Sequence, residues 1–189
     1  MTPCLSTIAR LSIAILAAMC AASPARADAA RDLLVIFEHT CAAPSHPESV
    51  EAMGPLAVRF GLAALPSKPD PDFAVFQIWK RDDGAGGVLA LNLYFRDRGA
   101  GPLGLKCVLG SNYEKRDVDV QTLVDELVID LGLPEPDKDH AGVADTQAIR
   151  EWRWTVPTGP NDRSYQVLYS PDGSLLIQFA RNVAKPASP

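Results

Sequence analysis

Apolar residues recur with two different periods along this chain, and the periods predict two kinds of element. Between 88 and 96, leucine and phenylalanine occupy every second position, which is the pattern of a strand buried on one side. Between 119 and 131, apolar residues recur every three or four positions, which places them on one face of a helix. The chain therefore combines strands with helices.

Turn residues divide the strand-like segments into two groups of three. Stretches rich in glycine or proline, among them the SPDG sequence at 170–173, separate neighbouring segments and favour hairpin connections. The predicted strands are 73–81, 88–96 and 105–109 in the first group and about 148–156, 163–169 and 174–181 in the second.

A helix is predicted before the first group of strands. Ser45 and Glu48 have the spacing of a capping box at its start, and Gly61 is placed to end it. Proline lacks an amide donor and crowds the preceding turn, so the Gly54-Pro55 pair is expected to kink or split this helix.

The second predicted helix is the 119–131 segment, which precedes the second group of strands. Either Asp117 or Asp119 caps its start, and Gly132 ends it. The apolar segment 31–41 lies before both helices, and its pattern fits a short strand as well as a helical turn. The sequence leaves the structure of that segment open.

These elements are typical of an α+β fold. Hairpin connections dominate between consecutive strands, so we expect an antiparallel sheet of about six strands with the two main helices packed on one face. The order helix, strand, strand, strand occurs twice, which hints at an αβββ-αβββ repeat, although no residue-level repeat accompanies it.

The first 27 residues have the pattern of a secretory signal peptide. Arg10 precedes an uncharged run at 11–22, and Ala25 to Ala27 matches the small-x-small pattern of a signal-peptidase site. The uncharged run is shorter than the roughly 20 residues that a membrane span needs. We therefore expect cleavage after Ala27 and a periplasmic or secreted product, 28–189, that forms one domain without a transmembrane segment.

The charge of the expected product argues against two classes of partner. The chain has 18 basic and 23 acidic residues, and loss of Arg10 and Arg26 leaves 16 basic residues and a net charge of −7. Such an acidic chain without a polybasic run is a poor match for nucleic acid or for an anionic membrane surface.

Cysteine usage predicts one covalent link. Cys4 and Cys20 belong to the signal, which leaves Cys41 and Cys107 as the pair in the expected product. Export takes this pair to an oxidising compartment, where two thiols that meet are usually joined. We therefore expect a Cys41–Cys107 disulfide.

His39 and His46 lie close to Cys41 and raise two alternatives to the disulfide. A thiol nucleophile would need Cys41 free and oriented by a base, and no third orienting group is evident. A zinc site would need three or four converging ligands, and the segment shows no complete set. We expect no bound metal, with His39 and His46 as the weak candidates for ligands.

Two further stretches have part of the residue spacing of a known binding motif but lack the rest of that motif. Asp137, Asp139 and Gly142 begin like a calcium-binding loop, but Ala148 stands where the loop needs glutamate. The glycines of the stretch 99–104 have the spacing of a dinucleotide-binding loop, yet a strand follows them where that loop opens a helix. Neither motif implies a cofactor, and none is expected.

Aromatic residues give the one positive indication of binding. Trp152 and Trp154 share one face of a predicted strand, and Tyr165 and Tyr169 share one face of its expected neighbour. Cross-strand aromatic pairs commonly stabilise sheets, so packing in or beside the core is the first interpretation. The alternative is an exposed platform for a glycan, a peptide or a protein partner.

Two stretches around the cysteines, one with Phe37 and Cys41 and one reading KCVLG around Cys107, accompany an alanine-rich signal, a central hairpin and a terminal strand pair. In this combination the chain resembles small exported proteobacterial proteins of unknown function. The resemblance implies an exported, disulfide-linked domain and no particular activity.

The sequence thus favours an exported, non-catalytic binding or interaction domain whose partner is a protein, a peptide or a glycan. The alternative is a periplasmic enzyme, such as a hydrolase that uses carboxylates or histidine. A polar pocket with converging carboxylates, or with His39 and His46, would favour the enzyme. An exposed aromatic face would favour binding.

Overall fold

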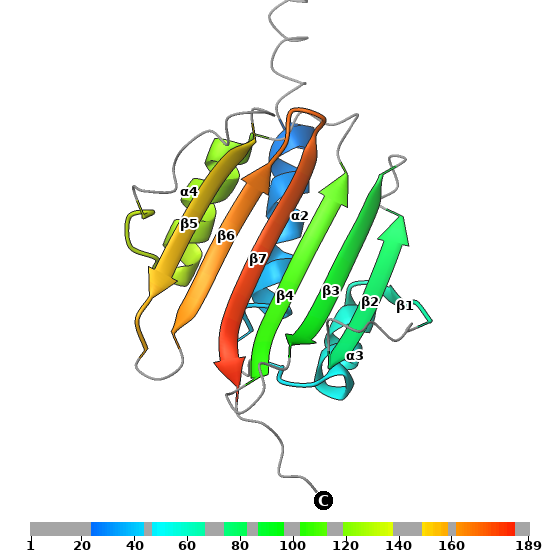
Figure 1. The fold of residues 1–189 in the computed structure, drawn as a ribbon. Helices are drawn as coiled ribbons and strands as arrows, with labels where there is room; N and C mark the ends of the chain where they lie inside the picture. Colours follow the sequence, from blue (N-terminus) through cyan, green and yellow to red (C-terminus); the bar gives the residue numbers. More distant parts are fainter. Residues whose placement is uncertain are drawn as a thin grey trace, which may run out of the picture.

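A computed structural model gives the fold of residues 24–43, 47–66, 74–82, 87–96, 103–112, 119–137, 149–158 and 162–183. Within these residues the chain forms three helices and seven strands (Figure 1). In chain order they are α2 (Pro24–His39), α3 (Val50–Arg59), β1 (Ala63–Ala64), β2 (Val75–Asp82), β3 (Val88–Arg96), β4 (Leu103–Asn112), α4 (Val120–Leu131), β5 (Arg150–Val156), β6 (Arg163–Tyr169) and β7 (Ser174–Val183).

All seven strands belong to one antiparallel sheet with the order β1-β2-β3-β4-β7-β6-β5 (Figure 1). Strands β2 to β4 follow one another as a meander, and so do strands β5 to β7. The meanders join where β4 pairs with β7 along the whole of both strands, from Leu103↔Val183 to Asn112↔Ser174. The predicted α+β class with an antiparallel sheet is confirmed.

One face of the sheet is covered by helices. Figure 1 shows α2 and α4 behind the strands, and the buried residues of helices and strands belong to one core cluster. Along β3 every second residue from Leu89 to Phe95 is buried, while the residues between them are more exposed. The opposite face has no helix over it within the described residues, and this asymmetry is what gives the strands their period of two.

The segment that the sequence left open is helical. Leu33, Leu34, Ile36 and Phe37 are buried at the spacing of one helical face, so α2 packs directly into the core. Thr40 Oγ1 donates a 2.6 Å hydrogen bond to the Ile36 carbonyl oxygen, which satisfies an acceptor that the helix end would otherwise leave free.

Helix α2 also crosses the expected cleavage point. It begins at Pro24, so cleavage after Ala27 would remove its first four residues. The buried positions described in this helix run from Leu33 onward. No helix in the described part of the chain is long and apolar enough to span a membrane.

Helix α3 differs from the predicted helix in two respects. Its N-cap is Ser49, whose Oγ accepts a 3.1 Å hydrogen bond from the Ala52 amide, whereas the predicted cap Ser45 lies outside the described residues. The helix also continues through Pro55, so of the two predicted effects, a kink or a split, the split is wrong. Gly54 favours the continuity, because one of the clashes of a proline ring is with the Cβ of the preceding residue, which glycine lacks.

The helix ends otherwise follow local chemistry. Of the two aspartates proposed as caps for α4, Asp119 takes the role, and its carboxylate accepts hydrogen bonds from the backbone amides of the first turn. The hydrogen bonds from Thr122 lower the pKa of Asp119. Gly61 and Gly132 follow their helices with φ values of 72° and 60°, a left-handed conformation that favours glycine.

The strands differ from prediction at β4 and β1. Strand β4 extends well beyond the predicted 105–109 because it lies in the middle of the sheet and pairs on both sides. The two-residue strand β1 was not predicted, since two alanines carry no period. Two helices and β1 precede the first meander, whereas α4 alone precedes the second, so the predicted αβββ-αβββ repeat is not confirmed.

Candidate functional site

The two cysteines hold the helical layer to the middle of the sheet. Cys41 and Cys107 form a disulfide with an S–S distance of 2.10 Å and a Cα–Cα distance of 5.4 Å, and both residues are buried. Cys41 follows the end of α2, and Cys107 lies on the covered face of β4. The predicted pairing is confirmed, and it leaves neither sulfur available as a thiolate.

The histidines near Cys41 are not gathered into a ligand set. His39 is the last residue of α2, is exposed, and stacks against Phe60 with 6.1 Å between ring centroids. His46 lies outside the described residues. Over the part of the chain that the structure describes, no three histidine, cysteine, aspartate or glutamate side chains gather as metal ligands would.

The four aromatic residues that suggested a binding platform lie on the covered face. Trp154 is fully buried and Tyr165 is 6% exposed, so both belong to the core. Trp152 and Tyr169 are partly buried against the same core, and the Arg150 guanidinium lies 4.7 Å from the centre of the Trp152 ring. Trp154 and Tyr165 therefore offer no surface to a ligand, and their placement agrees with the packing interpretation.

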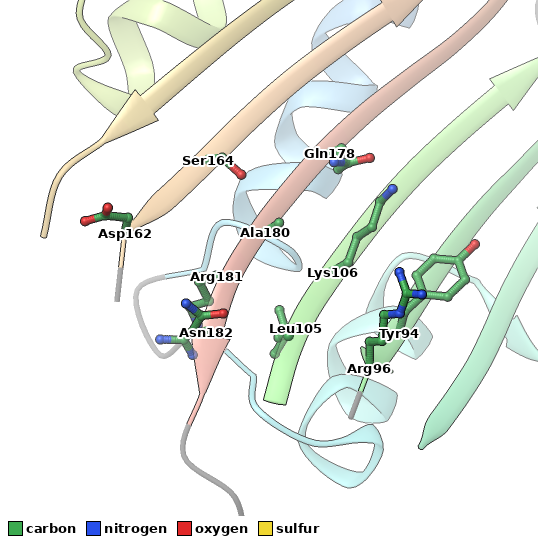
Figure 2. Close-up of a pocket in the computed structure, with 11 residues that line it drawn as sticks. Tyr94, Arg96, Leu105, Lys106, Asp162, Ser164, Gln178, Ala180, Arg181 and Asn182 are labelled. Atoms are coloured by element: carbon green, nitrogen blue, oxygen red, sulfur yellow. The ribbon is translucent and has the colours of Figure 1, made fainter. Parts of the chain in front are cut away.

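The uncovered face of the sheet carries a depression of about 600 Å³ over its central strands (Figure 2). It spans β3, β4, β7 and β6, and the strand register places most of its lining residues on the side away from the helices, with Leu105 and Arg181 as exceptions. The described residues that line it are Tyr94, Arg96, Gly104, Leu105, Lys106, Asp162, Ser164, Gln178, Ala180, Arg181 and Asn182.

Strand register explains why the face is hollowed there. Tyr94 pairs with Lys106, Lys106 with Ala180, and Ala180 with Ser164, so these residues form one row across four strands. The row thus places two small side chains, those of Ala180 and Ser164, beside two large ones, those of Tyr94 and Lys106. Gly104, which pairs with Asn182 and is the diagonal neighbour of Ala180 in the next row of the face, has no side chain at all. The floor of the depression is low because its residues are small.

Two cationic residues, Arg96 of β3 and Lys106 of β4, lie on one side of this floor. Arg96 pairs with Gly104, so it is the diagonal neighbour of Lys106, and such neighbours have Cβ atoms about 7 Å apart. Much of Lys106 is exposed to solvent. Partial burial nevertheless lowers the pKa of its ammonium group. Among the described residues no carboxylate lies within ion-pair distance of either cation.

Tyr94 forms the wall beside these cations. Its ring stacks on Phe76 of β2 with 4.8 Å between centroids, and burial raises the pKa of its hydroxyl group. Figure 2 shows Tyr94 and Arg96 on β3 beside Lys106 on β4, with Ser164 on the far side of β7. The depression thus has an aromatic, cationic side and a small, polar side.

Other polar groups on the same face are paired among themselves. On β5 and β6, Glu151 accepts hydrogen bonds from Gln166 and from Arg153, the latter at 2.6 Å. At the rim, the Asp162 carboxylate accepts a 3.3 Å hydrogen bond from the Thr158 amide. On the β5 side of the face Glu151 is therefore already paired with a cation, in contrast to the two cations on β3 and β4.

A second cluster of charges lies between α2 and α4, away from the depression. Arg31 Nη1 lies 2.6 Å from Asp130 Oδ2 and 3.5 Å from Glu126 Oε2. Burial, together with the neighbouring Asp130 carboxylate, raises the pKa of Glu38 to about 7. Hydrogen bonding to Arg31 lowers the pKa of Asp130. Glu38 is therefore held largely protonated below neutral pH in the folded state.

Glu38 should make the contact between α2 and α4 sensitive to pH. In the unfolded chain Glu38 loses its proton near its ordinary pKa of 4.5, and in the folded protein near 7. The unfolded state binds fewer protons within that window, so stability should fall as the pH rises from about 4.5 to 7. Glu38→Gln should abolish this contribution, and urea midpoints at pH 4.5 and 8 measure it.

Glu51→Gln is the matched control for that experiment. Glu51 is exposed on α3, and hydrogen bonding at the start of that helix lowers its pKa, so its contribution to stability does not fall as the pH rises. An identical fall in urea midpoint between pH 4.5 and 8 for Glu38→Gln and the unmodified protein would contradict the assignment.

Sequence reasoning did not identify the residues of the depression. Tyr94, Arg96, Lys106 and Gln178 occupy the outward positions of period-two strands, and this alternation was the one available signal. Their meeting depends on the pairing of β4 with β7, which brings together residues more than 70 positions apart. No pattern in the sequence specifies that pairing.

Comparisons with known proteins give no further information about this site. No protein-family model, no curated protein and no solved structure matches the chain. The function must therefore be argued from the site itself.

Proposed function

We propose that the protein is an exported, non-catalytic binding domain and that the uncovered face of its sheet is the ligand-binding surface. The observation that carries the proposal is the depression of about 600 Å³ at the centre of that face. Small-molecule sites in proteins typically have volumes of about 300–1,000 Å³, with a few placed polar groups.

The scaffold around the depression supports this proposal. Its lining residues stand mainly on regular strands, whose backbone is fixed by pairing on both sides at β4 and β7. Cys107, one residue from Lys106, is tied through the disulfide to the end of α2 on the other side of the sheet. Sites on such rigid elements hold their side chains in place without a ligand.

The polar groups support binding more than acid–base catalysis. A hydrolase of the kind considered from the sequence would need two carboxylates, or a carboxylate and a histidine, facing one another. Asp162 is the one carboxylate among the described lining residues, and no histidine is among them. That carboxylate also accepts a hydrogen bond from the Thr158 amide.

The edges of the sheet are weaker candidates for the binding surface. An exposed edge strand recruits partners through unpaired backbone groups. Strand β1 covers part of β2, and the Asp137 amide donates a 2.9 Å hydrogen bond to the Arg153 carbonyl oxygen on β5. Both edges are thus partly occupied by the chain itself.

Export is part of the proposal. The pattern of residues 1–27 predicts a signal peptide, and a buried disulfide is characteristic of proteins that fold in an oxidising compartment. A binding domain in the periplasm or outside the cell would meet small metabolites, peptides and glycans of the envelope.

Capture of ligands from an envelope extract of the source cells tests the proposal. Ala180→Trp fills the floor of the depression, and Leu176→Trp places the same ring on the same strand and face, outside the lining. Species bound by the unmodified protein should be retained by Leu176→Trp and lost by Ala180→Trp, as read by mass spectrometry. Equal capture by all three proteins would place the binding surface elsewhere.

A further inference from the structure

The lining of the depression specifies a class of ligand, and this inference rests on the binding function proposed above. We propose that the depression binds a small hydroxylated anion, such as a sugar phosphate or a sugar acid. Its acidic group lies between Lys106 and Arg96. Its hydroxyl groups face Ser164, Gln178 and Asp162.

The two cations give the first argument. Lys106 and Arg96 are diagonal neighbours on adjacent strands, and no carboxylate among the described residues pairs with either of them. Like charges so placed repel one another, and Lys106 has in addition lost part of its hydration, as its lowered pKa indicates. A carboxylate or phosphate group between them would relieve both effects through charge-assisted hydrogen bonds.

The opposite side of the floor gives the second argument. Ser164 lies two strands from Lys106 in the same row, and neighbouring strands are about 4.8 Å apart, so the row spans about 10 Å. Ser164 and Gln178 offer both donors and acceptors, and Asp162 offers acceptors. These groups match hydroxyl groups better than a second acidic group, which Asp162 would repel.

Charge and size limit the ligand to a small molecule. The chain as a whole carries a net charge of −5, and Glu151 on the neighbouring strand pair is already engaged by Arg153 and Gln166. A polyanion or an anionic membrane would extend beyond the two cations over a chain of net negative charge and be repelled by it. A ligand of a few hundred Å³ stays within the depression, which has a volume of about 600 Å³.

Isothermal titration calorimetry of the oxidised protein with four small molecules tests the inference. Glucose 6-phosphate and glucuronate represent hydroxylated anions, inorganic phosphate represents the bare acidic group, and glucose is the neutral control. We expect at least one hydroxylated anion to bind with a millimolar or lower Kd, phosphate to bind more weakly, and glucose not to bind measurably.

Charge-neutralising variants locate the binding. Lys106→Gln and Arg96→Gln should each weaken binding about tenfold or more, because each removes a charge-assisted hydrogen bond. Lys80→Gln, a lysine of β2 on the same face outside the lining, should change the Kd less than twofold. The affinity should also fall as the pH rises toward the pKa of Lys106.

Several outcomes overturn the inference. They are the absence of binding by both hydroxylated anions, binding of glucose as tight as that of its phosphate, and equal affinity in the Lys106→Gln and Lys80→Gln variants. If the anions fail while capture from the envelope extract still depends on Ala180, the ligand class is wrong and the proposed surface stands. If capture does not depend on Ala180 either, the proposed binding surface is wrong.

Discussion

Replacing Cys41 and Cys107 together by alanine should lower the free energy of unfolding by about 4 kcal/mol. The disulfide closes a loop with a sequence separation of 66 residues, and the chain-entropy treatment gives a loss of this size for such a loop. Alanine is preferred to serine because both positions are buried and a hydroxyl group would need a partner there. The loss is a large share of the roughly 5–15 kcal/mol that holds a domain folded.

Urea titration of the variant and of the unmodified protein measures this difference. Reduction of the unmodified protein should reproduce most of the effect, because it opens the same loop without changing other side chains. Intact mass should change by two hydrogens on reduction. Two freely alkylatable thiols in the native, non-reduced protein, or a loss below about 1 kcal/mol in the double variant, would contradict the covalent link between α2 and β4.

Leu127→Ala should cost about 2–5 kcal/mol of unfolding free energy. Leu127 is fully buried in the middle of the apolar stripe of α4 and belongs to the same core cluster as Leu91 and Leu93 of β3. Truncation removes apolar surface from the core and leaves a cavity, and both effects destabilise. Urea titration with a two-state fit gives the value.

Asp125→Ala is the control on the opposite face of the same helix. Asp125 is exposed and accepts a 2.9 Å hydrogen bond from Gln121 one turn earlier, an interaction worth a few tenths of a kcal/mol. Its removal should change stability by less than about 0.5 kcal/mol. Equal, small losses from Leu127→Ala and Asp125→Ala would contradict the packing of α4 on the sheet.

Local patterns predicted the elements whose period is strong. The alternation of leucines in β3 and the apolar stripe of α4 reflect burial on one side, so these elements matched prediction almost to the residue. The same holds for β6, where buried Tyr165 and Val167 alternate with less buried residues. In each case one side of the element faces the core and the other faces water.

Other elements depend on context that local patterns lack. The segment that became the end of α2 is short, and its buried residues come in adjacent pairs, so neither a period of two nor a helical period is clear in it. Ser45 and Ser49 both offer a hydroxyl group before α3, and the capping-box spacing favoured the wrong one. Strand β1 is defined entirely by its pairing with Trp79 and Lys80 of β2.

The candidate site could be predicted only in part. The disulfide was predicted from composition and the expected compartment, since two cysteines remain after the predicted signal. The aromatic residues of β5 and β6 were identified correctly as sharing faces, but the sequence does not say which face the helices cover. The depression depends on long-range strand order, and that order is set by how the two meanders join at β4 and β7.

A chemical-shift map of the backbone amides tests the central claim most directly. The oxidised protein, labelled with nitrogen-15, is titrated with the envelope extract and then with the species captured from it. If the ligand binds at the uncovered face, the largest chemical-shift changes should occur around Tyr94, Lys106, Ala180 and Ser164. The amide shifts of α2 and α4 should change little. Shifts confined to the helical layer or to the edge strands β1 and β5 would contradict the account.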